Sequence, residues 1–332
     1  MNKIPSFMRS TLVALVLVLS LTLWSSSTSL AQDIVYETHP VPVSQDYTNA
    51  FDAAVQEMII DQSFIDAFRN YMYFPVPACV KDLVQYPQIN PFANRKALVM
   101  CMETGVISPY LEVKRMVGNT IVKKINAHYG VNLQAQFKYL NTSGKGFFNT
   151  MKDGVDSGEC DLISSNVTPT NERVSVAHFQ CNYGMTSQAF LRTNRDPHLS
   201  LKTLQDLNQT NIVVGASRGT TYENVIKTQL SAAQYVPLDD GDVPYDAIKN
   251  NQVHAVIGDG VTYLIWVKQN PSICQNCTVN FYNSPYGYGT FTTNRIIASS
   301  SATRSYCGSC FMNTWSGYLL FLGMVMWMMY IL

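Results

Sequence analysis

The sequence predicts an α/β protein with two lobes, each built on a largely parallel sheet. Three observations lead to this fold class. The 332 residues are enough for about two domains of ~150 residues. Hydrophobic residues make up 47% of the chain, which supports a sizeable core. Between residues 106 and 282, strand-like and helix-like patterns alternate in two successive blocks, and such alternation is typical of parallel sheets covered by helices.

Residues 1–31 have the layout of a secretory signal. Lys3 and Arg9 precede an uncharged apolar stretch, and small residues follow up to Ala31. This order predicts export and cleavage after Ala31, with an uncleaved membrane anchor as the alternative.

Residues 32–95 are predicted to form an N-terminal extension with one helix over residues 51–71. Apolar residues recur there at helical spacing, so that one face can pack against the rest of the protein. They are Phe51, Val55, Met58, Ile59, Ile65 and Phe68. Four prolines between residues 75 and 91 then predict a loop.

The first lobe is predicted over residues 96–192 and the second over residues 193–285, with residues 286–298 returning to the first. In the first lobe we expect strands at 106–111, 133–139 and 161–165 and helices at 119–129 and 147–157. In the second lobe we expect strands at 211–216, 234–238, 253–258 and 278–282 and helices at 220–230, 244–251 and 260–270.

The C-terminal region is predicted to be a linker, residues 299–314, followed by a membrane anchor, residues 315–332. The last 18 residues carry no charge, and a helix of that length spans ~27 Å, close to a bilayer core. A glycolipid-anchor signal also fits, because the small residues Ser299, Ser300 and Ser301 precede a polar spacer and the apolar tail. A buried core helix is the third interpretation.

Eight cysteines follow the signal, and an even number in an exported protein indicates disulfides. They are Cys79, Cys101, Cys160, Cys181, Cys274, Cys277, Cys307 and Cys310. The last four form two C-x-x-C pairs, which also fit a zinc ribbon. Their wide separation and the oxidising compartment favour disulfides.

The charge balance and the missing motifs exclude several function classes. Lysine plus arginine number 23 and aspartate plus glutamate number 23, so that the formal charge is zero. A chain without a basic excess is a poor binder of nucleic acid. The sequence contains no motif of serine hydrolases, P-loop proteins, zinc proteases or dinucleotide-binding proteins. We therefore expect neither a nucleic-acid partner nor a cofactor.

Three expected strand ends carry short polar groups. A hydroxyl-rich turn after the strand at 161–165 leads to Arg173. Thr220 and Thr221 begin a second-lobe helix, whose free N–H groups and dipole attract a carboxylate. Asp259 ends another strand. Ligands bind beyond the carboxyl ends of strands in such sheets. An arginine with an aspartate complements the carboxylate and ammonium of a zwitterion.

These segments resemble the family 3 extracellular solute-binding proteins. Residues 161–173 resemble the signature D-x-I-x-S-x-x-T-x-T-x-E-R, residues 201–222 resemble the entry into the second lobe, and residues 246–259 resemble A-L-x-x-G-x-x-D-A-x-x-x-D. The resemblance implies a type 2 periplasmic-binding fold, in which two lobes close over a small solute such as an amino acid. The hinge is then expected near residues 192–194 and 284–286.

The resemblance also implies roles for residues of the first lobe. Arg173 would hold the carboxylate of the ligand, with help from Thr170 and the backbone of Ser165. Tyr110 falls where the family often has an aromatic residue that stacks on the ligand.

In the second lobe, the backbone amides of Thr220 and Thr221 would contact the ligand, and Asp259 would accept its ammonium.

The chain departs from the family pattern at His254, where aspartate is usual. The family's terminal first-lobe helix has no counterpart after residue 298, whereas residues 51–64 resemble it. We therefore hypothesise a permuted order, which an N-terminal helix far from the return strand would contradict.

The leading functional hypothesis is an exported binding protein that captures a small polar solute, an amino acid, for a membrane transporter or a receptor. An enzyme on the same scaffold, a prephenate-like dehydratase, is the second hypothesis. It needs a general acid or base in the cleft, for which Glu172, Glu223 and His254 are the candidates. A degenerate domain for cell-surface recognition is the third.

Overall fold

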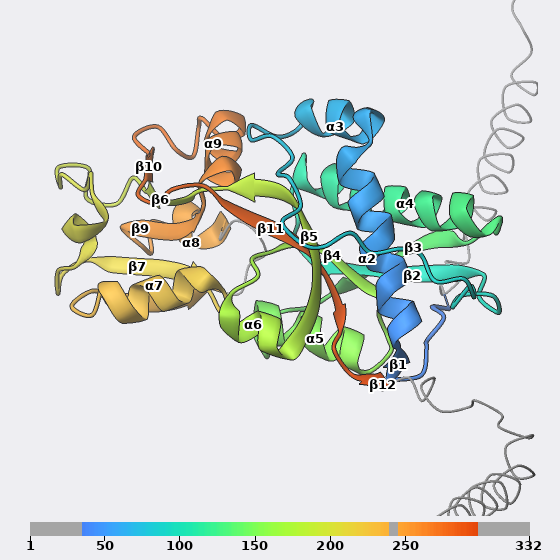
Figure 1. Cartoon of the computed structure of the whole chain (residues 1–332). Coiled ribbons are helices and arrows are strands. Elements are labelled where there is room, and N and C mark those ends of the chain that lie inside the picture. The colour runs from blue at the N-terminus through green and yellow to red at the C-terminus, as the bar shows by residue number, and fades with distance from the viewer. Residues whose placement is uncertain (1–34, 239–244, 298–332) are drawn as a thin grey trace, which may run out of the picture. The chain divides into compact units, whose positions relative to one another are not determined.

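The computed structural model describes residues 35–238 and 245–297, and two five-stranded sheets make up its framework (Figure 1). Both sheets belong to a compact unit that begins at Glu37. The predicted signal, linker and anchor lie outside the described residues. Within the two described ranges, no helix combines the length and apolar character needed to cross a membrane.

The first sheet has the strand order β3-β2-β4-β11-β5. Its strands are β2 (Ala97–Glu103), β3 (Gln134–Leu140), β4 (Leu162–Val167), β5 (Ala177–Thr186) and β11 (Tyr286–Thr293). β2 pairs in parallel with β3 and β4, whereas β11 is antiparallel to β4 and β5. All residues of β2 are buried, as expected for a parallel strand with helices on both faces.

Helices cover both faces of this sheet, and together with it they are called lobe 1. They are α2 (Gln45–Ile60), α3 (Gln62–Arg69), α4 (Tyr110–Tyr129), α5 (Phe147–Asp156) and α6 (Asn171–Val176). Leu98 and Met100 of β2 share a core with α2 and α4. Because side chains alternate along a strand, Val99 and Cys101 face the other side, where α5 contacts β2.

The N-terminal helical region differs from the single helix predicted over residues 51–71. α2 begins earlier because the Ser44 hydroxyl accepts a hydrogen bond from the Tyr47 N–H (3.2 Å) and caps the helix. Asp61 then ends α2 with an extended backbone, and its carboxylate accepts from the Ser63 N–H (2.8 Å) to cap α3. One amphipathic pattern therefore corresponds to two helices.

The strand predicted over residues 106–111 is wrong. These residues form a turn and the start of α4, which begins at Tyr110 rather than at residue 119. Pro109 stands directly before the first helical residue, a place that proline tolerates, whereas it lacks the N–H that a strand interior needs. The strand of this region is β2.

The second sheet has the order β10-β6-β9-β7-β8 and, with its helices, is called lobe 2. Its strands are β6 (Gln188–Arg192), β7 (Val213–Ser217), β8 (Gln234–Leu238), β9 (Ala255–Asp259) and β10 (Thr278–Phe281). Its helices are α7 (Thr221–Gln229), α8 (Tyr245–Lys249) and α9 (Gly260–Gln269), with a short 3-10 turn, η1 (Leu204–Leu207). One apolar core lies under α7, and another lies under α8 and α9.

The chain passes between the sheets at two neighbouring points. The first crossover is Ser187, not residues 192–194, because β6 is hydrogen-bonded to β9 and β10 from its first residues onward. The strand β6 therefore belongs to lobe 2, although the first lobe was expected to extend to residue 192. The second crossover lies between Phe281 and Tyr286. The Ser187 hydroxyl donates to the Asn283 carbonyl (2.5 Å), so that the crossovers lie side by side.

A short parallel pair joins the first and last strands of the described fold. Val43 of β1 (Val43–Ser44) pairs with Ile296 of β12 (Ile296–Ile297). The helix α2 follows β1 directly and therefore starts beside the end of the return segment. This pairing supports the permuted order, which stays a hypothesis.

The predicted disulfides are confirmed for six cysteines. The pairs are Cys79–Cys181, Cys101–Cys160 and Cys274–Cys277. Cys274 and Cys277 are thus bonded to each other, and Cys307 and Cys310 lie outside the described residues. The part of the chain that the structure describes contains no cluster of three or more metal-ligating side chains.

Candidate functional site

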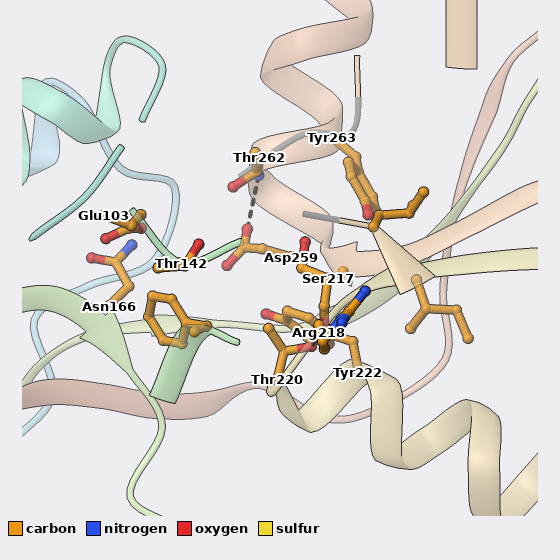
Figure 2. Close-up of a pocket in the computed structure, with 14 residues that line it drawn as sticks. Glu103, Thr142, Asn166, Ser217, Arg218, Thr220, Tyr222, Asp259, Thr262 and Tyr263 are labelled. Carbon is orange, nitrogen blue, oxygen red and sulfur yellow. Dashed lines mark hydrogen bonds between the residues drawn. The ribbon is translucent and has the colours of Figure 1, made fainter. Parts of the chain in front are cut away.

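A cavity of about 90 Å³ lies between the two sheets and takes its walls from both (Figure 2). Its polar lining is formed largely where strands end. Lobe 1 contributes Glu103, Thr142 and Asn166, and lobe 2 contributes Ser217, Arg218, Thr220, Asp259 and Thr262. Figure 2 shows Asp259 between the side chains of the two lobes. This is the position in which α/β proteins bind ligands.

Asp259 is the last residue of β9 and caps α9. Its Oδ1 atom accepts from the Thr262 N–H (2.8 Å) and from the Tyr110 hydroxyl of lobe 1 (3.0 Å). Tyr110 is only 1% exposed. Burial raises the pKa of Tyr110 well above its ordinary value, and the negative charge of Asp259 adds to the effect. Tyr110 therefore remains a protonated donor that fixes the carboxylate, and it is not among the residues that line the cavity.

Arg173 lies in α6, 8% exposed, and reaches across to lobe 2. Its guanidinium donates to the carbonyls of Thr168 (3.3 Å) and Gly219 (3.1 Å) and stands 4.7 Å from the Phe148 ring centroid. Among the described residues, no carboxylate forms an ion pair with it. Burial lowers the pKa of Arg173 to about 10. Thr170 caps α6 by accepting from the Arg173 N–H (3.3 Å), and so positions this arginine.

Thr220 caps α7 and lines the cavity. Its hydroxyl accepts from the Glu223 N–H (3.3 Å) and donates to the Ser217 carbonyl (2.6 Å). Thr221 is the first helical residue, and it is not one of the lining residues. The structure thus brings Thr220 and Asp259 to the cavity and places Arg173 against the residue that precedes Thr220.

Ser165 is not one of the lining residues, but its side chain contacts one of them, and the backbone contact that the resemblance implied stays a prediction. The Ser165 hydroxyl donates to Glu103, and the same carboxylate pairs with Lys114 of α4. All three residues are buried. Burial favours the neutral form of Glu103, but the Lys114 ammonium and the Ser165 hydroxyl outweigh it and hold the pKa of Glu103 below its ordinary value.

Sequence reasoning missed Glu103 as a lining residue. The signal was the same as for Asp259, because Glu103 ends a buried strand. The strand was predicted over residues 106–111 and not over residues 97–103, where β2 lies. Glu103 was therefore not recognised as the end of a strand.

Further contacts hold the two lobes together beside the cavity. The Phe147 N–H of α5 donates to the Arg218 carbonyl of lobe 2 (2.9 Å). The hydroxyls of Tyr222 and Tyr286 are 3.1 Å apart. The cleft in this structure is therefore closed by direct contacts between the lobes.

The three acid–base candidates of the enzyme hypothesis do not line the cavity. His254 precedes β9, whereas Asp259 ends it, and its ring bonds to the Val213 N–H (2.9 Å) and to Asp196 (2.8 Å). Glu223 accepts from the Gly219 N–H (2.7 Å), and Glu172 is exposed. These residues therefore have structural or surface positions.

Comparisons with known proteins give the fold and one related sequence. No family model matches the chain. A "Probable histidine-binding protein" of Campylobacter jejuni is 29% identical over 140 residues, which are 42% of this chain and 51% of that protein. The chain thus spans about half the length of this curated relative.

Two solved structures resemble the chain. The ancestral amino acid-binding protein AncCDT-1, described as a precursor of cyclohexadienyl dehydratase, has a TM-score of 0.50, with 17% identity over 61% of this chain and 84% of its own. Holo ArgBP from T. maritima has a TM-score of 0.49, with 19% identity over 62% of this chain and 86% of its own. The predicted fold class, a two-lobed α/β protein like the amino-acid-binding proteins, is confirmed.

Proposed function

We propose that this chain is an exported binding protein that captures a small amino acid by closing its two lobes. The observation that carries the proposal is the placement of Arg173. A buried charge is costly unless it is paired, and among the described residues the partners of this guanidinium are two backbone carbonyls and an aromatic ring. Arg173 is not itself one of the lining residues, but it bonds to Gly219, which stands between the lining residues Arg218 and Thr220. The carboxylate of a ligand bound beside Thr220 would supply the missing negative partner of this guanidinium.

The ammonium of the same ligand has a natural partner in Asp259, which lines the cavity and is held in place from both lobes. Thr170 and Ser165 act indirectly, through Arg173 and Glu103. The cavity of about 90 Å³ is small beside the ~300–1,000 Å³ of pockets for drug-sized ligands. A single amino acid therefore suits it better than a larger ligand, and the likeness to a histidine-binding protein supports an amino acid as the ligand.

Export is supported by the signal-like residues 1–31 and by the three disulfides, which persist in oxidising compartments. The bound amino acid would pass to a membrane transporter or be read by a receptor. Membrane attachment through residues 315–332 stays a prediction from the sequence.

The test is thermal unfolding of the full chain with each of the twenty amino acids and a set of small organic acids. A ligand at 100 times its dissociation constant adds ~2.7 kcal/mol of stability, which raises the Tm by several degrees. We expect a shift with at least one amino acid, and we expect Arg173→Ala and Asp259→Ala to abolish it. Arg115→Ala and Asp153→Ala, which remove exposed charges outside the cavity, serve as controls and retain it. A folded protein that no amino acid stabilises would contradict the proposal.

A further inference from the structure

The lobe 1 end of the cavity contains a carboxylate whose charge is already balanced. Glu103 lines the cavity, and its side chain is 5% exposed. Lys114, at 1% exposure, forms an ion pair with one carboxylate oxygen, and Ser165 donates to the other. Because both charges are removed from water, solvent does not weaken this pairing as it does on a surface.

The neighbouring groups at this end are neutral, and two of them are polar beside the aromatic ring of Phe147. Thr142 offers a hydroxyl, and Asn166 offers an amide. The Asn166 Oδ1 atom accepts from the Tyr183 hydroxyl (2.7 Å), which leaves the amide N–H groups to donate to an acceptor on a ligand. This end of the cavity therefore presents hydrogen-bonding groups without net charge.

The α-ammonium and α-carboxylate of a bound amino acid would lie away from the lobe 1 end of the cavity. Asp259 stands toward the middle of the cavity, and Ser217, Arg218 and Thr220 line the lobe 2 end (Figure 2). A ligand whose ammonium meets Asp259 has its side chain toward Glu103, Thr142 and Asn166. A charged side chain there would meet the Glu103 carboxylate, whose charge is already balanced by Lys114 outside the cavity lining. It would lose its hydration without an unpaired charge to compensate.

We propose, on the basis of the proposed function, that this cavity selects amino acids with an uncharged hydrogen-bonding side chain, an amide or a hydroxyl, over cationic and anionic ones. Serine, threonine, asparagine and glutamine belong to this class. Histidine joins it at pH 8, where its ring is uncharged.

The experiment is isothermal titration of the full chain at pH 8 with these neutral amino acids and with lysine, arginine, aspartate and glutamate. We expect the best neutral ligand to bind at least tenfold more tightly than any charged one. In Lys114→Met the carboxylate of Glu103 is left unbalanced, and the preference should shift at least tenfold toward lysine or arginine. In Glu103→Gln the ammonium of Lys114 remains, and the shift should be toward aspartate or glutamate.

Lys123→Met on the exposed face of α4 is the matched control and should leave the preference unchanged. If Lys114→Met does not fold, as judged by circular dichroism, Glu103→Gln decides, because its expected shift has the opposite sign. Preferential binding of lysine or arginine by the unaltered chain would overturn this inference and leave the proposed function standing. A chain that binds no amino acid would overturn both.

Discussion

Asp161 opens the sequence signature, and its carboxylate stabilises the fold without lining the cleft. It accepts hydrogen bonds from both terminal nitrogens of Arg95 (2.6 and 2.8 Å), from the Tyr47 hydroxyl (2.7 Å) and from the Val99 N–H (2.6 Å). These partners belong to α2, to the residues before β2 and to β2 itself. One buried carboxylate therefore joins the N-terminal helix to the first sheet.

Replacing this carboxylate should be costly. Asp161→Asn removes the buried negative charge and leaves Glu37 (3.2 Å) as the remaining carboxylate partner of Arg95 among the described residues. Breaking a buried pair in this way destabilises by about 3–5 kcal/mol. Urea unfolding measures the loss. Asp153→Asn is the control, because Asp153 pairs with Lys145 at the surface (2.6 Å) and exposed pairs contribute about 0–1 kcal/mol. Equal losses in the two variants would contradict this view of Asp161.

Local sequence patterns predicted part of the candidate site. Thr220 and Asp259 were found because each stands where a strand ends or a helix begins, a feature visible within a few residues. The partners of Tyr110 and Ser165 could not be found in this way, because Tyr110 bonds to a residue 149 positions away and Ser165 to one 62 positions away. Contacts of that range depend on how the sheets are assembled.

At the level of elements, the sequence patterns located most helices and strands but missed one strand and one helix break. The helices α5, α7 and α9 and the strands β3 and β8 lie close to their predicted ranges. β2 was missed because the first six of its seven buried residues form an apolar run without alternation. The break between α2 and α3 was missed because Asp61 acts as a cap within a continuous amphipathic pattern.

The irregular segment over residues 70–96, which connects α3 to β2, is fixed to lobe 1 at several points. The Cys79–Cys181 disulfide and a hydrogen bond from the Lys81 ammonium attach it to β5. Gln56 of α2 accepts from the Val84 N–H (2.8 Å) and donates to the Asp82 carbonyl (2.8 Å). The segment is therefore a fixed part of the fold.

Removing the long-range disulfide should destabilise the protein far more than removing the short one. The cysteines of Cys79–Cys181 are 102 residues apart, whereas those of Cys274–Cys277 are 3 apart. Loop-closure entropy gives about 4–5 kcal/mol for the first and about 2 kcal/mol for the second. Urea unfolding of the two double alanine variants measures both. A larger loss in the Cys274→Ala/Cys277→Ala variant would show that the first bond does little to hold the segment.

For the whole molecule, two glycines determine how closely the lobes approach. Gly146 of lobe 1 and Gly219 of lobe 2 have positive φ angles of 81° and 72°. A Cβ atom on Gly146 would lie 3.0 Å from the Arg218 carbonyl oxygen and 3.1 Å from the Gly219 Cα. Closure thus depends on the absence of a side chain at this point.

Gly146→Ala should weaken ligand binding while leaving each lobe folded. A penalty of about 1.4 kcal/mol on the closed form lowers affinity by about tenfold. Titration with the amino acid that gives the largest thermal shift measures the affinity, and small-angle scattering measures the closure. Gly130→Ala is the control, since Gly130 also has a positive φ (65°) but its added Cβ would meet nothing within 4 Å. Equal effects of the two substitutions on affinity would mean that backbone strain alone is responsible.

The pairing of β1 with β12 has a mechanical consequence. The chain enters and leaves the described fold at one place, and both strands flank lobe 1, whereas lobe 2 is joined to it through two adjacent crossovers at Ser187 and at residues 282–285. If either end of the described fold were attached to a solid surface, lobe 1 would be held in place, and lobe closure would move lobe 2. The displacement that accompanies ligand binding would then be concentrated in lobe 2. A fluorescent dye attached at the exposed Thr228 of α7 would report each closure as a change in fluorescence.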